Sequence, residues 1–411
     1  MSTRHQCIVA VLFAAIALTL ICLPSRASAE PESPVKTIHV DDPAITFSPG
    51  NWTGDSGRGG AIYRQTWYPG AYFRLEWTTT GKPNRVRIKL DPSVYGGVVK
   101  QTPRITYVVD GRSRVDVPCD GDIDVTEVSP YREHKLAVYF QTSLQSERWG
   151  TTNSGGHNVV RVTGVELDAD AATVPQIQPL KWILEVGDSI TEGSGTTGNL
   201  DAYSYFVGQA FRSLGYEYCV SACGWSGWLQ YGDRPKDVPP YYFVSGSSNG
   251  EHGLYDAVQS RWDKIDGNDH SLLDITGHIS GYGGKGQEPS LILINYGTND
   301  AFYQSNLSDL QASITQALEA LRIAAPNAKL VLMIPFEQFS APTIKKAFAA
   351  YQTRHSTDHA TYLIDLGPEA ESALRGEGYY GGVHPNMRGH AVFAARILAA
   401  MAAKGILRPG D

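Results

Sequence analysis

The sequence is poor in positive charge and in cysteine, and it has no long apolar run beyond its first 29 residues. Its 35 lysines and arginines stand against 42 aspartates and glutamates, which gives a formal net charge of −7. A chain with this balance lacks a broad basic surface for a phosphate backbone, so we expect no nucleic acid partner. What the chain does contain, 42% hydrophobic and 19% charged residues, is the composition of a globular protein with a core.

The first 29 residues have the pattern of an export signal. Arg4 precedes an apolar run from Cys7 to Leu23, and Ala27-Ser28-Ala29 is a small-residue cleavage site. We therefore expect cleavage near Ala29 and a secreted or periplasmic protein with no membrane span in the mature chain. The alternative is an uncleaved anchor, for which the apolar run is short.

Residues 35–170 alternate apolar and polar positions in short runs broken by Gly, Pro, Asn and Asp, which is the pattern of half-buried strands. These runs predict an all-β domain of two packed antiparallel sheets. Residues 171–180 lose this periodicity and are expected to be a linker. The clearest strand patterns are Ala71–Trp77, Arg85–Leu90, Ile105–Asp110 and Lys135–Phe140.

From residue 181 to residue 411, continuous apolar runs alternate with segments of helical period, which is typical of a parallel sheet covered by helices on both faces. Such sheets bind ligands at the carboxyl ends of their strands, so the residues just after each run are candidates for chemistry. The expected strands are Trp182–Val186, Tyr216–Ser221, Leu291–Tyr296, Leu330–Ile334 and Tyr362–Leu366. The expected helices are Tyr203–Leu214, Leu307–Ala325, Pro342–Arg354 and Asn386–Ala403.

Four short segments of this half carry residues suited to acyl transfer. Gly187-Asp188-Ser189 places a serine where a strand turns toward a helix, a position that suits a nucleophile and also a plain helix N-cap. The backbone N–H of Gly227 and the side-chain amide of Asn299 are donors for a developing negative charge. His384 lies in a loop before the last expected helix, from which it can reach back over the sheet as a general base.

Together these segments resemble the SGNH, or GDSL-type, hydrolase family, whose four blocks correspond to Gly187-Asp188-Ser189, Gly227, Gly297-Thr298-Asn299-Asp300 and His384. The likeness covers residues 181–405. It implies a flavodoxin-like parallel sheet sandwiched by helices, and esterase-type hydrolysis without a cofactor. By this resemblance Ser189 is the nucleophile, His384 is the base, and the oxyanion hole consists of the Ser189 amide, the Gly227 amide and Asn299.

The strand-rich region in front of this domain is similar to the arrangement in carbohydrate esterase family 2, where a jelly-roll domain precedes an SGNH domain. The likeness rests on domain order and on scattered residues such as Pro69-Gly70-Ala71-Tyr72-Phe73. Enzymes of that family remove acetyl groups from plant polysaccharides. The resemblance therefore implies an acetyl xylan esterase-like carbohydrate O-acetylesterase, with an acetylated polysaccharide or oligosaccharide as its partner.

One position departs from the SGNH pattern. Many members carry an aspartate three residues before the histidine, and Gly381 stands at that place here. In proteases with a Ser-His-Asp triad, loss of the aspartate costs about 10⁴ in turnover because the imidazole adopts the wrong tautomer. We expect a main-chain oxygen of residues 379–382 to orient His384, with Glu377 or Asp365 as alternatives. Asp188 is expected to brace the turn rather than to act as the acid that orients His384.

A long stretch after the second expected strand is rich in aromatic residues, and flat rings stack well on sugar faces. Trp225 and Trp228 flank Gly227 and are expected to contact the substrate. The alternative is that these aromatics fill a core beneath the insertion. The remaining ones are Tyr231, Tyr241, Tyr242 and Phe243.

Two other functions stay open. A lipid or short-chain aryl esterase of the same fold would need an apolar groove. A catalytically inactive carbohydrate-binding protein is suggested by the missing aspartate, although Ser189, Asn299 and His384 are intact. No zinc or calcium motif appears, so we expect no metal. Three cysteines follow the signal, and Cys219 and Cys223 either pair in one disulfide or remain thiols.

Overall fold

The computed structural model describes most of the chain from residue 34 onward. The described residues are 34–55, 62–80, 85–95, 102–126, 128–141, 158–177, 179, 181–230, 288–368 and 383–407. The expected export signal lies outside them. So do the aromatic residues Tyr231, Tyr241, Tyr242 and Phe243 of the long insertion.

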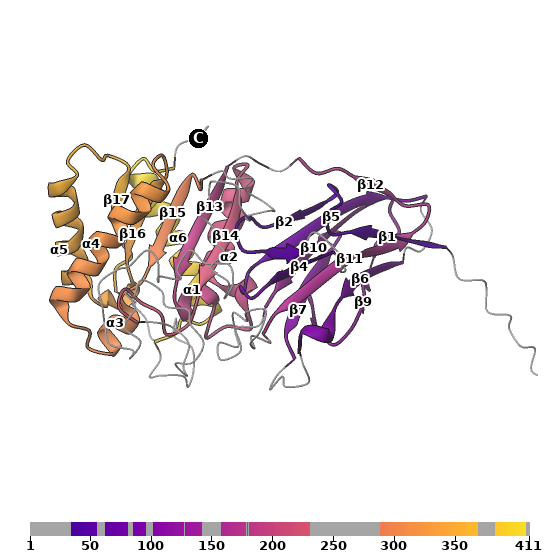
Figure 1. The fold of residues 1–411 in the computed structure, drawn as a ribbon, viewed down its shortest axis with the longest axis horizontal. Coiled ribbons are helices and arrows are strands. Elements are labelled where there is room, and N and C mark those ends of the chain that lie inside the picture. Colours follow the sequence, from indigo (N-terminus) through magenta and orange to yellow (C-terminus); the bar gives the residue numbers. More distant parts are fainter. Residues whose placement is uncertain are drawn as a thin grey trace, which may run out of the picture. The chain divides into compact units, whose positions relative to one another are not determined.

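Two antiparallel sheets make up the first half of the described chain (Figure 1), as the sequence predicted. The first has the order β3-β4-β11-β6-β9, and β1 also pairs with β11. Its strands are β1 (Val35–His39), β3 (Thr53–Asp55), β4 (Tyr63–Thr66), β6 (Val86–Leu90), β9 (Ile123–Asp124) and β11 (Val160–Asp168). The second has the order β12-β5-β10-β7-β8, and β2 also pairs with β5. Its strands are β2 (Ile45–Phe47), β5 (Tyr72–Thr78), β7 (Arg104–Val109), β8 (Val115–Pro118), β10 (Glu133–Phe140) and β12 (Ala172–Val174).

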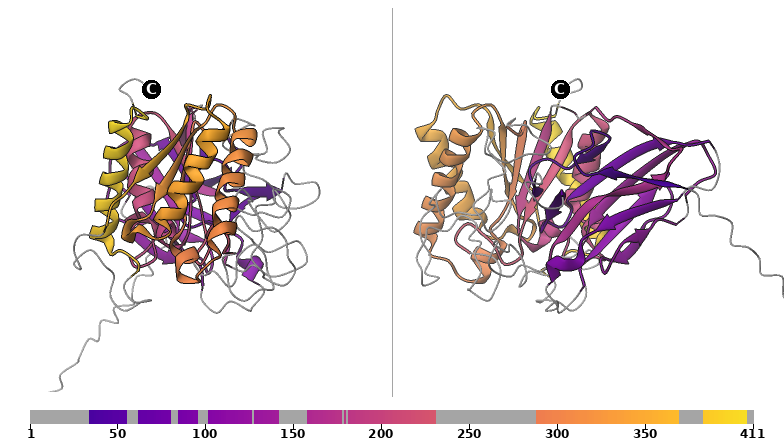
Figure 2. Two further views of the ribbon diagram at one scale, coloured as in Figure 1. Left: turned by 90° about the vertical axis from the view of Figure 1, so that its left-hand side faces the viewer. Right: turned by 45° about the vertical axis from the view of Figure 1, so that its right-hand side comes forward.

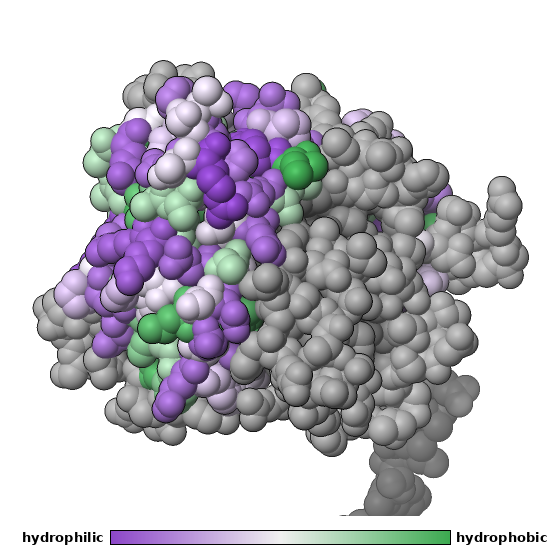
Figure 3. All heavy atoms as spheres, turned by 60° about the vertical axis from the view of Figure 1, so that its left-hand side comes forward, coloured by the Kyte–Doolittle hydropathy of each residue, from purple (hydrophilic) through white to green (hydrophobic). Residues whose placement is uncertain are grey.

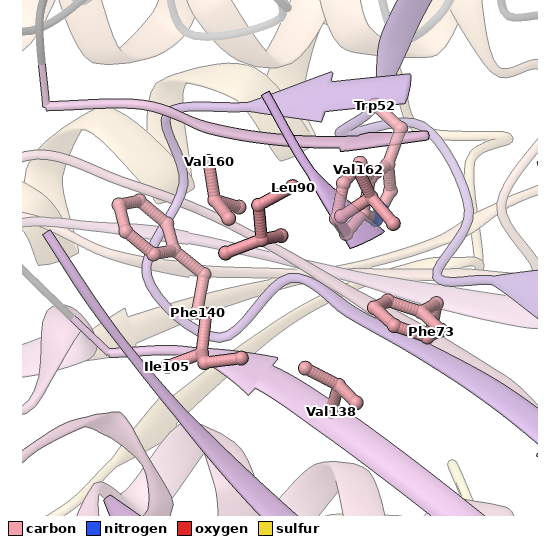
Figure 4. Close-up of a pocket in the computed structure, with 8 residues that line it drawn as sticks. All are labelled: Trp52, Phe73, Leu90, Ile105, Val138, Phe140, Val160 and Val162. Atoms are coloured by element: carbon pink, nitrogen blue, oxygen red, sulfur yellow. The ribbon is translucent and has the colours of Figure 1, made fainter. Parts of the chain in front are cut away.

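The core of this antiparallel half lies between the two sheets. Alternate residues of β5, β6 and β10 are buried, as a period of two requires for strands with one inward face. Figure 4 shows side chains from both sheets around one small space: Trp52, Phe73, Leu90, Ile105, Val138, Phe140, Val160 and Val162. Burial of these apolar groups stabilises the half.

The expected linker begins as part of a sheet. Ala172–Val174 form β12, which pairs with β5, and a turn with a hydrogen bond from the Ala171 N–H to the Asp168 carbonyl leads into it. β12 is an edge strand of the second sheet, and its backbone pairing needs no apolar periodicity, which explains why the sequence pattern missed it.

A parallel sheet in the order β14-β13-β15-β16-β17 forms the second half. Its strands are β13 (Trp182–Gly187), β14 (Glu217–Ala222), β15 (Leu291–Asn295), β16 (Lys329–Ile334) and β17 (Thr361–Asp365). Each lies within one residue of its expected bounds at either end. Because β13 is flanked by β14 on one side and β15 on the other, the strand order reverses at β13, and such switch points are where these sheets bind ligands.

Helices cover both faces of the parallel sheet (Figure 2). Leu184 and Val186 of β13 pack in one core with α4 (Leu307–Ala324) and α5 (Ala341–Arg354). Ile183 packs in the other core with α2 (Tyr203–Ser213) and α6 (Met387–Ala403). Strands buried on both faces have continuous apolar runs in the sequence, and these runs predicted the five parallel strands. Two short helices, α1 (Ser189–Glu192) and α3 (Thr298–Phe302), follow β13 and β15.

Buried contacts join the two halves, and the chain from Val35 onward forms one compact unit. The Tyr72 hydroxyl on β5 donates to the Glu217 carboxylate on β14, and the Tyr72 and Tyr218 rings lie 4.8 Å apart. Asn51 Nδ2 donates to the Val220 carbonyl at 3.3 Å. β14, the edge strand of the parallel sheet, is therefore packed against the antiparallel half.

Cys119, Cys219 and Cys223 are buried thiols that form no disulfide with one another. Among the described residues, no helix is long and apolar enough to cross a membrane. The described residues on the face shown in Figure 3 are mainly hydrophilic, with small hydrophobic areas between them.

Candidate active site

Ser189 lies at the first position of α1, directly after the carboxyl end of β13. The turn between them is tight: a methyl group on Gly187 would lie 1.9 Å from the Thr191 hydroxyl. Asp188 is the N-cap, and its Oδ1 accepts the Ile190 N–H at 3.0 Å. Since the capping role is taken by Asp188, the serine hydroxyl is left for another partner.

That partner is His384. Ser189 Oγ lies 2.8 Å from His384 Nε2, although the two residues are 195 positions apart in the sequence. His384 precedes α6, whose N-cap Asn386 accepts the Gly389 N–H and so fixes the start of the helix. The His384 side chain is buried, and this burial lowers the pKa of its imidazole to about 4. The ring is therefore neutral at pH 7 and able to accept the serine proton.

Two of the three expected oxyanion donors have a hydrogen available. The Ser189 N–H is at the start of α1, where helix N–H groups lack intrahelical acceptors, and no described residue accepts it. Asn299 lies at the start of α3, and its Nδ2 donates one hydrogen to the Ser226 carbonyl at 2.8 Å. A side-chain amide nitrogen carries two hydrogens, so this bond holds Asn299 in place and leaves the second for an oxyanion.

The third expected donor, the Gly227 amide, is engaged. Its N–H donates to the Gln230 carbonyl at 2.9 Å and closes a tight turn. Asp300 fixes that turn, because its carboxylate accepts the N–H groups of Trp228 at 2.9 Å and Leu229 at 2.8 Å. A methyl group on Gly227 would lie 2.4 Å from the Asp300 carboxylate, so this close approach requires glycine.

Two acidic residues that sequence reasoning left without a role therefore support the site. Asp300 holds the turn after Gly227, and Glu192 on α1 accepts the Gly224 N–H at 2.9 Å. Asp300 belongs to the Gly297-Thr298-Asn299-Asp300 block and Glu192 lies three residues after Ser189, and this nearness to the candidate residues was the only sequence signal for them.

The carboxylates considered for orienting His384 lie elsewhere. Asp188 caps α1, as expected, and burial raises its pKa to about 8. Asp365 accepts from Gln338 Nε2 at 2.6 Å and from the Gly367 N–H at 2.9 Å, and it pairs with Lys345. Glu377 and residues 379–382 lie outside the described residues, so the expected main-chain partner of His384 stays a prediction.

The two tryptophans differ from each other. Trp228 was expected to contact the substrate, but its side chain is fully buried and packs edge-on against Tyr296, with ring centroids 5.6 Å apart. This burial favours the alternative, a core role, for Trp228. Trp225 is half-buried, has a φ of 66°, and lies 6.3 Å from the ring of Tyr303. Such backbone strain in a non-glycine residue is typical of functional sites.

No group of three or more His, Cys, Asp or Glu side chains in the described part of the chain is arranged to hold a metal ion. The neighbouring carboxylates Asp122 and Asp124 pair with Lys89 and Arg87, respectively. What the site does assemble is a serine, a neutral imidazole and amide donors, which is the equipment for acyl transfer.

Known proteins share the fold of this chain. No curated protein matches the sequence. Solved structures do match the fold: a family two carbohydrate esterase from Cellvibrio japonicus (15% identity, TM-score 0.61) covers 90% of this chain and 98% of its own. A family two carbohydrate esterase from Clostridium thermocellum in complex with cellohexaose (17%, 0.61) covers 88% and 100%. An acetyl xylan esterase from the rumen bacterium Butyrivibrio proteoclasticus (13%, 0.62) covers 90% and 99%.

At these identities the structures show a shared two-part fold, with antiparallel sheets before a parallel sheet. The family model for GDSL-like lipases and acylhydrolases matches residues 186–392, which include Ser189, Asn299 and His384. The chain therefore belongs to the GDSL-like lipase/acylhydrolase family.

Proposed function

We propose that this protein is a serine esterase that removes O-acetyl groups from plant-type polysaccharides or oligosaccharides. The observation that carries the chemistry is the 2.8 Å contact between Ser189 Oγ and His384 Nε2 at the carboxyl edge of the parallel sheet. The substrate class is supported by the fold shared with family two carbohydrate esterases over both halves of the chain. The half-buried ring of Trp225 beside this edge is suited to stacking on a sugar.

The reaction follows from the geometry. Ser189 Oγ attacks the acetyl carbonyl carbon while its proton passes to His384 Nε2, and the tetrahedral oxyanion is bound by the Ser189 N–H and Asn299 Nδ2. Collapse breaks the bond to the sugar oxygen, which takes the proton from His384. Water then attacks the acetyl-serine with His384 as base, and acetate leaves as Ser189 Oγ regains a proton.

Within this proposal the Gly227 amide joins the oxyanion hole only if its bond to Gln230 opens when substrate binds. The same turn is held by Asp300. We therefore propose that the Gly227 segment mainly shapes the edge of the site at the carboxyl ends of the parallel strands. A backbone oxygen of residues 379–382 completes a Ser-His dyad by orienting His384.

The test is acetate release from acetylated xylan, acetylated glucomannan and a short aryl acetate, with wild type beside Ser189→Ala. We expect release from polysaccharide, and a loss of at least about 10⁴-fold in the variant, because nucleophile removal disables the whole unit. Hydrolysis of the aryl acetate alone would contradict the polysaccharide substrate. No release from any substrate would favour a binding protein.

The first 29 residues bear on where the protein acts. We propose that the chain is secreted or periplasmic after cleavage near Ala29 and that the mature protein consists of a β-sandwich domain of residues 35–170 and a hydrolase domain of residues 181–411, joined by residues 171–180. Terminal sequencing of the protein recovered outside the cytoplasm should start at Glu30. A start at Met1 would instead support the uncleaved anchor.

A further inference from the structure

The loop between α1 and α2, residues 194–201, lies between the antiparallel half and the catalytic histidine. On one side it meets two residues of the antiparallel half that lie outside its strands: a methyl group on Gly70 would lie 2.5 Å from the Asn199 side chain, and one on Gly198 would lie 2.2 Å from Gln141 Oε1. The Leu200 N–H also faces Gln141 Oε1, at 3.5 Å. The loop is thus pressed closely against the antiparallel half.

On its other side the loop touches His384. A methyl group on Gly195 would lie 2.8 Å from Cβ of His384 and 2.6 Å from the Pro385 carbonyl oxygen. Contacts of this kind leave no room for the loop and the histidine to move independently. Displacement of residues 194–201 therefore changes the space available to the imidazole.

The loop itself is held together by hydrogen bonds. The Thr196 hydroxyl contacts the carbonyls of Gly193 at 2.7 Å and Gly198 at 2.8 Å. The Thr197 hydroxyl donates to Asp201 Oδ2, and the Asp201 N–H donates to the Gly198 carbonyl at 3.0 Å. A segment bonded in this way moves as one body, so a force at Asp201 is transmitted to Gly195.

Arg114, just before β8 in the antiparallel half, binds the 194–201 loop. Its Nη1 donates to Asp201 Oδ1 at 2.6 Å and its Nη2 to the Leu200 carbonyl at 3.0 Å. The guanidinium also lies 5.3 Å from the ring of Tyr205 on α2, which orients it. The Asp201 side chain is only 10% exposed, so without Arg114 this carboxylate would be left nearly buried with Thr197 as its remaining side-chain partner.

We propose that Arg114 is a positioning residue for the Ser189–His384 pair, acting from the antiparallel half through Asp201 and the 194–201 loop. This rests on the proposed function, in which the pair is catalytic. The antiparallel half then contributes to turnover directly, by holding the base in reach of the nucleophile, whatever sugar it does or does not bind. A displacement of about 1 Å at a catalytic group can cost about 10²-fold in rate.

The experiment compares Arg114→Ala with Arg74→Ala. Arg74 makes the matched ion pair across the same interface, with Glu217, but at the first residue of β14, which is the edge of the sheet opposite Ser189. The readouts are kcat and KM for a short aryl acetate, and the rate constant for inactivation by a small aryl phosphonate, which reports how readily Ser189 is activated by His384.

For Arg114→Ala we expect a fall of about tenfold or more in kcat and in the inactivation rate, with KM changed less than about twofold, because binding of a small ester does not depend on the loop. Arg74→Ala should retain both rates within about twofold. Equal losses in the two variants, or unchanged rates in Arg114→Ala, would overturn the proposal.

Arg114→Lys keeps the test decisive if the alanine variant does not fold. An ammonium group can approach Asp201 but does not span to the Leu200 carbonyl as well, so its rates should fall between those of wild type and the full loss, while Arg74→Lys stays at wild-type rates. Wild-type rates in Arg114→Lys would then overturn the proposal. Failure of the proposed function is distinguishable, since it appears as activity that survives in Ser189→Ala or as a wild type that phosphonate does not inactivate.

Discussion

At the scale of single residues, the burial of His384 determines its chemistry. The imidazole contacts Ser189 Oγ through Nε2 and is almost enclosed, and this desolvation lowers the pKa of the ring to about 4 from an ordinary value of 6.5. Only the neutral ring can accept the serine proton. The site is therefore built to keep its base ready in mildly acidic as well as neutral solution.

The acidic limb of the pH profile of kcat/KM should show this lowered pKa of His384. As pH falls, activity should persist through 6.5 and decline only toward about 4, where His384 takes up a proton. Initial rates on a short aryl acetate between pH of about 3.5 and 8 measure the limb. A midpoint near 6.5 would mean that the free enzyme exposes the imidazole to water or pairs it with a carboxylate.

At the scale of elements, the central strand β13 carries an acid where an apolar residue would be expected. Glu185 is fully buried between β14 and β15, and neither of its carboxyl oxygens has a hydrogen-bond partner among the described residues. Burial raises the pKa of this carboxyl well above 4.5, so it is held as the neutral acid. The strand thus contains a group whose ionisation opposes folding.

Glu185→Gln should therefore stabilise the protein increasingly as pH rises. An acid whose pKa is raised on folding favours the folded state most below its unfolded value, about 4.5, and this contribution is lost as pH rises toward the folded pKa, by about 1.4 kcal/mol per pH unit. Urea unfolding at pH of about 5 and 8 measures the difference. The exposed Glu133→Gln on β10 is the control, and an equal effect of the two changes at both pH values would contradict the assignment.

At the scale of the whole molecule, the two halves share buried polar contacts. Tyr72 of the antiparallel half donates to Glu217 of the parallel half, and Arg74 and Arg212 pair with the same carboxylate. The Tyr72 and Tyr139 rings pack in the same core as Val207 and α6. Separation of the halves would break these polar contacts and expose the apolar surfaces of the Tyr72 and Tyr139 rings to water, which is costly.

We therefore expect the halves to unfold together although each has its own sheets. A single calorimetric transition, with equal calorimetric and van't Hoff enthalpies, should coincide with the loss of tryptophan fluorescence. Tyr72→Phe, which leaves the Glu217 carboxylate without its hydroxyl donor, should lower the stability of the whole transition by about 1–3 kcal/mol. Two separate transitions in wild type would show that the interface is not part of the cooperative unit.

The sequence by itself determined the elements and predicted Ser189 and His384 as the candidate catalytic pair, whose side chains the structure brings into contact. Continuous apolar runs placed the parallel strands within a residue of their bounds, because the burial of a strand on both faces is determined by its own residues. The carboxyl-end rule then brought Ser189 and Asn299 to one edge, and the motif spacing added His384. The short edge strand β12, which pairs through its backbone, was not readable in this way.

Tertiary structure decided everything that depends on which neighbour arrives from a distant part of the chain. Local pattern could not tell that Trp228 packs into the core while Trp225 stays half-exposed, or that Gln230 engages the Gly227 amide. Nor could it pair Arg114 with Asp201, 87 positions away. Hydrophobic patterning encodes how much of a side chain is buried, whereas the partner of a polar group is fixed only when the sheets have packed.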